Sequence, residues 1–387
     1  MKIVIIAGYD FSIAWSLEIF VKKLLENNDV TVISDIHDGY EHGHYIDKAK
    51  KWGVKHEYVK TYRFISPYRD IKYLITLYRI LRKQQCDMVI NIATKPNIYG
   101  SIAAWWVGVE RIVCCGWGLG LTFEKTRNVK RIVLKYIVSV LYRCAFSISD
   151  KVWFTNRNDL DYLVSKGIIN PGKAVVTKGW INTEEYSPTS VPRDVSGKLR
   201  SKLGYADSDK IVIMVARMSW AKGVRQFCEA SDELRSDYPH VRFVLVGQED
   251  IGSADSVPTS YLERYKEHEN FTWLGYRIDI RELYATSYLA VFPSYYKEGG
   301  WPRGVIEPMA MGKPVITTDS EDCKNAVKDG VNGLLVPAKD SLSLAEAIEK
   351  IVNDEELASR FGLRSRKMIL KEHNEELIMT QLINAIM

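Results

Sequence analysis

The chain has 387 residues, of which 46% are hydrophobic and 26% charged, a composition typical of a globular protein with two or three domains. It has no apolar run of roughly eighteen residues, so no membrane-spanning helix is expected, and its six cysteines lack the paired spacing of a zinc site. The formal net charge of +5 combines a basic first half with an acidic second half, so the first half is expected to bind an anionic partner. The sequence has no helix-turn-helix, RNP or zinc-finger pattern that would indicate binding to nucleic acid.

Short apolar runs alternate with helical patterns along the chain, as in an α/β protein with parallel sheets. Residues 2–7 are interpreted as a buried first strand rather than a signal peptide. The turn Gly8-Tyr9-Asp10 after them lacks the dinucleotide fingerprint, which argues against NAD. Further strands are predicted at residues 30–33, 87–91, 151–155, 211–216, 243–247, 289–292 and 315–317. Helices are predicted at residues 13–25, 70–81, 127–146, 156–167, 304–311, 344–352, 355–369 and 373–387.

The segment from residue 39 to residue 49 is polar and rich in His and Tyr, which predicts a mobile loop. His42 and His44 lie in this segment, but the sequence offers no third ligand beside them. No metal site is therefore expected there.

Two acids, Glu298 and Glu307, lie on either side of a Gly-rich turn between the strand at 289–292 and the helix at 304–311. In open α/β sheets, ligands bind beyond the carboxyl ends of the strands, and helix N-termini receive phosphate groups there. This stretch therefore predicts a site for a phosphorylated ligand. The alternative is that one acid is a solvated loop residue and the other stabilises the start of a helix.

The stretch FPSYYKEGGWPRGVIEPMAMGKPVI resembles the donor-sugar site of retaining glycosyltransferases of the GT-B fold, family 4, whose signature is two Glu separated by seven residues. Here eight residues separate Glu298 from Glu307, and the extra one falls among residues 299–301. The resemblance implies two Rossmann-like α/β domains with parallel sheets, facing each other across a cleft. Residues 1–187 would bind the acceptor, with the helix at 373–387 packing back on them, and residues 191–370 would bind the nucleotide sugar.

The segment VARMSWAKG places Arg217 and Lys222 at the end of the predicted strand 211–216. Two cations at such a turn suit a diphosphate and would stabilise it as a leaving group, although they could also be plain surface cations. The resemblance implies that these two residues, together with Glu298 at the sugar, form the catalytic group. It also implies a donor site that consists of Gly8, Tyr276, Gly300, Pro302, Arg303, Gly304 and Glu307.

The run TKPNIYG and the Gly-rich segment 116–120 are similar to a bacterial subgroup of family 4 that builds O-antigen, capsule and lipid-linked oligosaccharides. This similarity implies an acceptor site at Lys95, Trp117 and Gly118. Lys95 follows a predicted strand, where a phosphate would lie, although it could instead cap a loop.

A basic stretch runs from Lys125 to Arg143, with six cations and no acid. On a helical wheel one side is basic and the other mostly apolar, which is the form of an interfacial membrane anchor. The alternative is a core helix whose basic side is merely solvated. The basic side consists of Arg127, Lys130, Arg131 and Lys135.

Together these features predict a retaining glycosyltransferase that moves a sugar from a nucleotide sugar to a hydroxyl of a lipid-diphosphate-linked acceptor in surface polysaccharide synthesis. UDP-N-acetylhexosamine or UDP-hexose is the expected donor, with GDP-mannose left open, and neither a metal nor another cofactor is expected. The protein is expected in the cytoplasm, on the inner face of the cell membrane. A nucleotide-sugar epimerase of the same fold and a non-catalytic scaffold are the alternatives.

Overall fold

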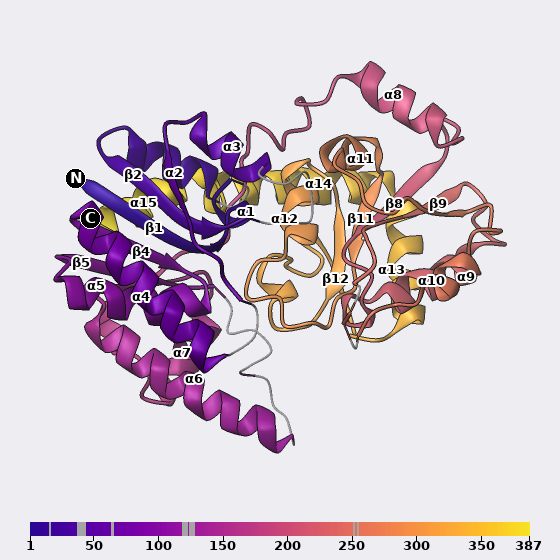
Figure 1. Ribbon diagram of the computed structural model, residues 1–387. Helices are drawn as coiled ribbons and strands as arrows, with labels where there is room; N and C mark the ends of the chain where they lie inside the picture. Colours follow the sequence, from indigo (N-terminus) through magenta and orange to yellow (C-terminus); the bar gives the residue numbers. More distant parts are fainter. Residues whose placement is uncertain are drawn as a thin grey trace. The chain divides into compact units, whose positions relative to one another are not determined.

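The computed structural model describes residues 1–14, 17–36, 44–62, 66–117, 123, 128–250, 252–253 and 255–387. The chain divides into two compact units (Figure 1). Unit 1 consists of Met1–Lys178 together with Glu376–Met387, and unit 2 consists of Gly179–Glu375. None of the described helices combines the length and the hydropathy needed to span a membrane.

Unit 1 is built around a parallel sheet in the order β3-β2-β1-β4-β5-β6-β7. Its central strands are continuous apolar runs because helices cover both faces of the sheet. The strands are β1 (Lys2–Tyr9), β2 (Asp29–Asp35), β3 (Lys55–Tyr58), β4 (Met88–Ile92), β5 (Arg111–Gly116), β6 (Lys151–Phe154) and β7 (Ala174–Val176). The helices are α1 (Phe11–Ala14), α2 (Glu18–Leu25), α3 (His44–Lys50), α4 (Pro67–Gln84), a π-helix (Pro96–Gly100) that runs into α5 (Ser101–Val107), α6 (Val129–Ile148), α7 (Arg157–Ser165) and α15 (Glu375–Ile386).

Unit 2 has a parallel sheet in the order β10-β9-β8-β11-β12-β13. Alternate residues of β8 enter two separate cores, one formed with α9 and α13 and the other with α11 and α12. The strands are β8 (Lys210–Val215), β9 (Val241–Val246), β10 (Phe271–Trp273), β11 (Leu289–Phe292), β12 (Val315–Thr318) and β13 (Gly333–Val336). The helices are α8 (Arg193–Lys202), α9 (Val224–Leu234), α10 (Thr259–Glu263), α11 (Ile280–Thr286), α12 (Arg303–Ala310), α13 (Ser341–Val352) and α14 (Glu355–Glu372).

The strand order reverses once in each sheet, between β1 and β4 in unit 1 and between β8 and β11 in unit 2. Doubly wound sheets bind their ligands at this reversal, beyond the carboxyl ends of the strands. In unit 1 a non-glycine residue with a positive φ, Ala93 at 86°, follows β4 directly at that point. Backbone strain of this kind is concentrated at functional sites. Each sheet is parallel and has the strand order of a doubly wound domain, so the prediction of two Rossmann-like α/β domains is confirmed.

The structure corrects two local predictions in unit 1. The mobile loop predicted at residues 39–49 is wrong for its second half, where α3 buries Ile46 and Ala49 at helical spacing. Residues 39–43, including His42, lie outside the described part of the chain. The helix predicted at 13–25 consists of two helices, α1 and α2. Within the described residues no group of His, Cys, Asp or Glu is arranged to hold a metal ion.

Candidate active site

The turn after β8 carries both predicted phosphate-binding cations. Arg217 lies just beyond the strand, and Lys222 ends a 3-10 turn at Trp220–Lys222. Asp255 holds this turn, because its carboxylate accepts hydrogen bonds from the Ser219 hydroxyl and, at 2.9 Å, from the Ala221 amide. Asp255, a residue outside the turn, therefore fixes the backbone of the turn that carries both cations.

The Lys222 turn packs closely against the end of the neighbouring strand β11. Gly223 has a φ of 84°, and a Cβ built on it would lie 2.2 Å from the Pro293 carbonyl oxygen. Only glycine fits this approach, both for its backbone conformation and for its lack of a side chain. The Ala221 carbonyl also accepts hydrogen bonds from the amides of Tyr295 and Tyr296, at 2.9 and 3.0 Å.

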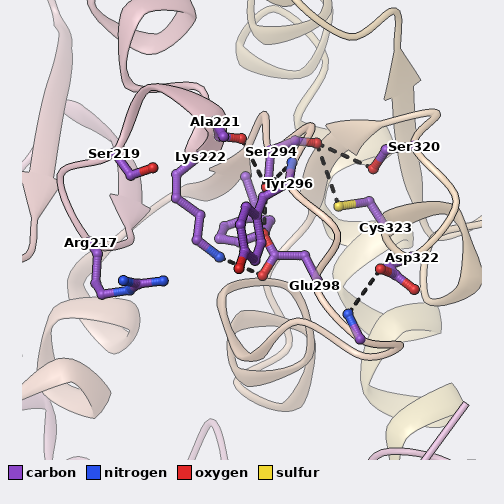
Figure 2. A network of polar contacts seen from close by, with 12 residues as sticks. Arg217, Ser219, Ala221, Lys222, Ser294, Tyr296, Glu298, Ser320, Asp322 and Cys323 are labelled. Atoms are coloured by element: carbon purple, nitrogen blue, oxygen red, sulfur yellow. Dashed lines mark hydrogen bonds and ion pairs between the residues drawn. The ribbon is translucent and has the colours of Figure 1, made fainter. Parts of the chain in front are cut away.

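Lys222 and Glu298 form a buried ion pair between these two strand ends (Figure 2). The Nζ–Oε2 distance is 2.5 Å, and the side chains are only 11% and 8% exposed. The second carboxylate oxygen, Oε1, accepts a 2.5 Å hydrogen bond from the Ser294 hydroxyl. The Lys222 ammonium also lies 4.7 Å from the centre of the Tyr296 ring. Glu298 therefore orients the ammonium group, despite the extra residue after it.

The loop that carries Glu298 is fixed by residues at the end of β12. The Ser294 carbonyl accepts hydrogen bonds from three side chains, those of Thr318, Ser320 and Cys323, the last two at 3.2 and 3.8 Å. Asp322 is buried, and its Oδ2 accepts a 2.9 Å hydrogen bond from the Gly299 amide. Figure 2 shows these contacts converging on the loop from one side. The loop is thus held in place by side chains that follow β12.

Arg217 is bound much more loosely than Lys222. Its Nη1 donates to both carboxylate oxygens of Asp250 at 3.0 Å, but the Arg217 side chain is 51% exposed. In Figure 2 its guanidinium points towards the same side of the turn as the Lys222 ammonium. An exposed ion pair contributes little free energy, so an anionic ligand can displace Asp250 from Arg217 at low cost.

Helix α12 brings the second predicted acid to the same edge of the sheet. A Cβ on Gly304 would lie 2.5 Å from the Phe292 ring, so glycine here allows the helix to approach β11 closely. Pro302 precedes the helix at its N-cap position. One turn later, Glu307 is buried and accepts a 3.0 Å hydrogen bond from Arg303 Nη1. The first turn of α12 therefore points its backbone amides beyond the strand ends, where Lys222 lies.

Burial raises the pKa of Glu307 above its ordinary value. The Arg303 guanidinium and the Tyr186 hydroxyl favour the charged form and act against that rise in pKa. The carboxylate therefore has less stabilisation than it would have in water, and further hydrogen-bond donors would be favourable there.

Two other residues of the predicted donor site are placed by backbone geometry. Tyr276 follows β10 and is half exposed, and the residue before it, Gly275, has a φ of 64°. Gly300 has a φ of 123°, in the region that favours glycine, and comes just before the start of α12.

Of the four residues predicted to bind a ligand in unit 1, three lie in the described part of the chain. Gly8 lies within β1, and a Cβ on it would meet only the Cβ of Ala93, at 3.9 Å, so packing alone does not require glycine. Lys95 is neutralised by Asp70 of α4, with an Nζ–Oδ1 distance of 2.5 Å. Trp117 packs edge-on against Trp153 with ring centres 5.1 Å apart. Gly118 lies outside the described residues.

Helix α6 shows its apolar side to solvent. Lys130 and Arg131 lie in its first turn, and Arg127 falls outside the described residues. Lys135 differs from the prediction of a solvent-facing or membrane-facing cation, because its Nζ donates to the Phe123 carbonyl at 2.9 Å. The buried side chains of α6 are those of Val138, Tyr142, Ala145 and Phe146. The exposed apolar residues are Val129, Ile132, Val133, Tyr136, Ile137 and Val140.

Sequence reasoning missed the acids that hold the cations and the loop. Asp250 and Asp255 follow β9, and Asp322 follows β12. The reversal lies between β8 and β11, and β9 and β12 are the next strands on either side. This position, after a strand close to the reversal, is the only signal in the sequence that could have identified the three acids.

Comparison with known proteins places both halves of the chain. Residues 195–368 match the family described as glycosyl transferases group 1, and residues 4–156 match the family described as glycosyl transferase 4-like. An N,N'-diacetylbacillosaminyl-diphospho-undecaprenol alpha-1,3-N-acetylgalactosaminyltransferase of Campylobacter jejuni is 28% identical over 317 residues, covering 81% of this chain and 80% of the relative. A UDP-Gal:alpha-D-GlcNAc-diphosphoundecaprenol alpha-1,3-galactosyltransferase of Escherichia coli is 26% identical over 297 residues, covering 76% and 74%.

Solved structures share the fold over almost the entire chain. Anabaena HepE in complex with UDP superposes with a TM-score of 0.79 at 18% identity, covering 99% of both chains. A glycosyltransferase from Rickettsia africae has a TM-score of 0.80 at 18% identity, covering 99% of this chain and 97% of that one. With a matching family for each half and the same fold throughout, the chain belongs to the glycosyltransferases of family 4, with the GT-B fold.

Proposed function

We propose that this glycosyltransferase is a retaining enzyme that moves a sugar from a UDP-sugar, either UDP-N-acetylhexosamine or UDP-hexose, to a hydroxyl of a lipid-diphosphate-linked acceptor. The observation that carries the proposal is the pair of cations, Arg217 and Lys222, at the strand reversal of unit 2 beside the start of α12. The names of the Campylobacter and Escherichia relatives include diphospho-undecaprenol acceptors, and HepE was solved with UDP. These relatives support a role in surface polysaccharide synthesis.

The diphosphate of the donor would lie between the two cations and the first turn of α12. Arg217 exchanges Asp250 for a phosphate oxygen, while Lys222 keeps Glu298 and adds a phosphate oxygen to its remaining donors. The backbone from Gly300 to Gly304 contributes helix-terminal amides. As the bond to the sugar breaks, negative charge develops on the diphosphate, and these groups stabilise it more strongly than they stabilise the bound donor.

Glu298 has both carboxylate oxygens engaged, by Ser294 and by Lys222. An ionised carboxylate can accept about four hydrogen bonds, so a sugar hydroxyl can share the remaining capacity. Its role in the proposal is to orient the Lys222 ammonium and to hold the transferred sugar.

Glu307 would accept hydrogen bonds from the ribose hydroxyls of the nucleotide. Burial raises its pKa, so the free carboxylate is poorly stabilised and two neutral donors would improve its surroundings. The uracil base would lie near Tyr276, at the end of β10.

The proposed reaction needs no carboxylate nucleophile and no metal or other cofactor. The acceptor oxygen attacks the anomeric carbon on the face from which the nucleotide departs, and a new C–O bond forms as the bond to the β-phosphate oxygen breaks. UDP leaves with that electron pair, and one of its phosphate oxygens takes the proton of the acceptor hydroxyl. Arg217 and Lys222 supply the positive charge that this step requires.

The acceptor would bind to unit 1 at its strand reversal. Gly8, which the family resemblance assigned to the donor site, leaves space beside Ala93 at this reversal, and Lys95 and Trp117 lie after the neighbouring strands. Because Asp70 already neutralises Lys95, the aromatic ring of Trp117 is the stronger candidate for contact with an acceptor sugar.

We also propose that α6 contacts an anionic membrane surface, where a lipid-linked acceptor would be found, on the inner face of the cell membrane. Six apolar side chains of α6 are exposed, and α6 contains no acid. An apolar helix side flanked by the cations Lys130 and Arg131 matches an interfacial helix. The observed packing does not fit a helix that buries this apolar side in its own domain.

Vesicle co-sedimentation tests the membrane proposal. Wild type should pellet with anionic vesicles at low salt and be released at high salt. Replacing Ile132 and Ile137 by Ser should reduce pelleting. The matched control replaces Leu363 and Leu370, two exposed leucines of α14 in unit 2, and should pellet like wild type. Equal pelleting of all three proteins would exclude α6 as the contact.

A donor panel tests the catalytic proposal and separates it from its rivals. Nucleoside diphosphate release should require both a UDP-sugar and a lipid-diphosphate-linked acceptor, and the product should keep the α-configuration of the donor in its proton NMR spectrum. An epimerase would convert the UDP-sugar to its isomer without an acceptor. A scaffold would bind UDP-sugar and release nothing.

A further inference from the structure

The chain leaves unit 2 at two points, after Glu375 and before Gly179. The segments at these points, residues 179–183 and 373–375, lie side by side and are called here the exit segments. The Ile181 amide donates to the His373 carbonyl at 2.9 Å, and the Glu375 amide donates to the Ile181 carbonyl at 3.1 Å. His373 is fully buried, and its Nδ1 lies 2.7 Å from the Gly179 carbonyl oxygen.

One side chain of the donor loop packs against both exit segments. The Trp301 ring lies 4.3 Å from the His373 ring, centre to centre, at an interplanar angle of 60°. A Cβ on Gly179 would lie 2.3 Å from the Trp301 Cβ and 2.7 Å from its Cγ, so glycine is required for this contact. Trp301 is therefore fitted against the two places where the chain passes between the units.

Trp301 also lies within the segment expected to bind the diphosphate. Gly299 and Gly300 precede it with φ values of 78° and 123°, and Pro302, the N-cap residue of α12, follows it. The Gly299 amide is held by Asp322. If this segment moves towards a bound phosphate, Asp322 restrains it at Gly299 and the exit segments contact it at Trp301.

The family spacing between the two acids has seven residues, whereas this chain has eight, with the extra residue among residues 299–301. The last of these three residues, Trp301, is the one that contacts Gly179 and His373.

We propose that Trp301 is a positioning residue that links occupancy of the diphosphate site to the conformation of the two exit segments. The inference rests on the proposed donor site. The chain passes from unit 2 to unit 1 through these segments, so a change at the diphosphate site would reach the connections to the acceptor-binding unit through Trp301. Loss of the ring should lower kcat by about tenfold to a hundredfold, the range expected for a misplacement on the order of 1 Å, with little change in donor KM.

Hydrogen–deuterium exchange with UDP as the probe tests this link. The Ile181 and Glu375 amides join the exit segments, so peptides that contain them report on the contact directly. In wild type, UDP should slow exchange in both peptides. In Trp301→Ala, UDP should still bind by calorimetry but leave exchange at both peptides unchanged, and Trp301→Phe should restore most of the protection and of kcat. Trp52→Ala, which removes a half-buried ring from unit 1, is the matched control.

A second variant approaches the same contact from the other side. Gly179→Ala should displace Trp301 and reduce kcat as Trp301→Ala does, although residue 179 lies outside the donor loop. The inference is wrong if UDP binds wild type without slowing exchange at the exit segments, or if Trp301→Ala transmits the protection fully. Failure of UDP to bind wild type in the calorimeter would instead remove the proposed donor site, and the inference with it.

Discussion

The buried pair of Lys222 and Glu298 makes the sharpest prediction about this site, because it separates stability from catalysis. Lys222→Met keeps most of the side-chain volume but removes the positive charge. The Glu298 carboxylate, which is only 8% exposed, then loses its ion pair and keeps the hydrogen bond from Ser294. Breaking one partner of a buried ion pair costs about 3–5 kcal/mol. For a unit of this size each kcal/mol lowers the melting temperature by roughly 2–4 °C, so a decrease of about 10 °C is expected.

Neutralising both partners should restore the stability but not the activity. In the double variant Lys222→Met with Glu298→Gln no uncompensated charge is buried, and the melting temperature should return to within a few degrees of wild type. Turnover should nevertheless remain about a hundredfold low, because the positive charge at the diphosphate is missing.

Differential scanning fluorimetry and diphosphate release at saturating donor measure the two quantities. Lys198→Met is the matched control, since Lys198 forms an exposed pair with Asp194 on α8 of the same unit. It should change neither quantity measurably. A melting temperature for Lys222→Met within 2 °C of the control, about 1 kcal/mol or less, would refute the argument from burial. Normal turnover of the double variant would refute the diphosphate role.

Arg217, Glu307 and Lys95 give four further predictions. Arg217→Ala should cost less than about 1 kcal/mol of stability, because its pair is exposed, yet lower turnover about a hundredfold at saturating donor; a stability loss as large as that of Lys222→Met would contradict this distinction. Glu307→Gln should weaken UDP binding in calorimetry by about 1.5–3 kcal/mol, and an unchanged dissociation constant would exclude the ribose contact. The folded protein holds the Glu307 proton more tightly than the unfolded chain, so stability from this group is lost as pH rises from the ordinary pKa of 4.5 through the raised folded pKa. Glu307→Gln should therefore melt higher than wild type at neutral pH, with a gain that shrinks towards pH 4.5, and a gain independent of pH would point to another cause. Lys95→Met should destabilise unit 1 by about 3–5 kcal/mol through the buried Asp70, and a wild-type melting curve would show that the pair is solvated.

Much of the fold was predictable because the central strands are continuous apolar runs. The strand predicted at 211–216 appears as β8, and the one predicted at 289–292 appears as β11. The internal strand β5 was not predicted although it is apolar and buried, whereas the edge strand β3 was missed for lack of any apolar pattern. β3 has the sequence KHEY and no fully buried residue, so it carries no apolar signal. Its strand conformation depends on pairing with β2.

The helical wheel of α6 showed an apolar side but could not show whether a domain covers it. The apolar character was visible in the sequence, yet the structure leaves that side exposed and packs the helix through a different stripe, including Val138, Tyr142 and Phe146. Which stripe is buried depends on the partners of the helix, and some of these, such as Ile98 of the π-helix and Cys114 of β5, are distant in the sequence.

The family was identifiable from the donor loop, and the comparisons confirm it, but the pairing of charges was not predictable. Arg217 and Asp250 lie far apart in the chain and meet because the parallel strands β8 and β9 end at the same edge. Lys95, after β4, meets Asp70 because the first turn of α4 packs there. The difference between a buried Lys222 and an exposed Arg217 likewise depends on packing. From the sequence alone the two cations look equivalent.

The central claim is that Arg217 and Lys222 hold a nucleoside diphosphate, and calorimetric titration of wild-type protein with UDP and with UMP tests it most directly. The second phosphate of UDP is the group that would meet both cations. UDP should therefore bind at least roughly tenfold more tightly than UMP, as expected for one or two charge-assisted hydrogen bonds. Equal dissociation constants for UDP and UMP would contradict the claim.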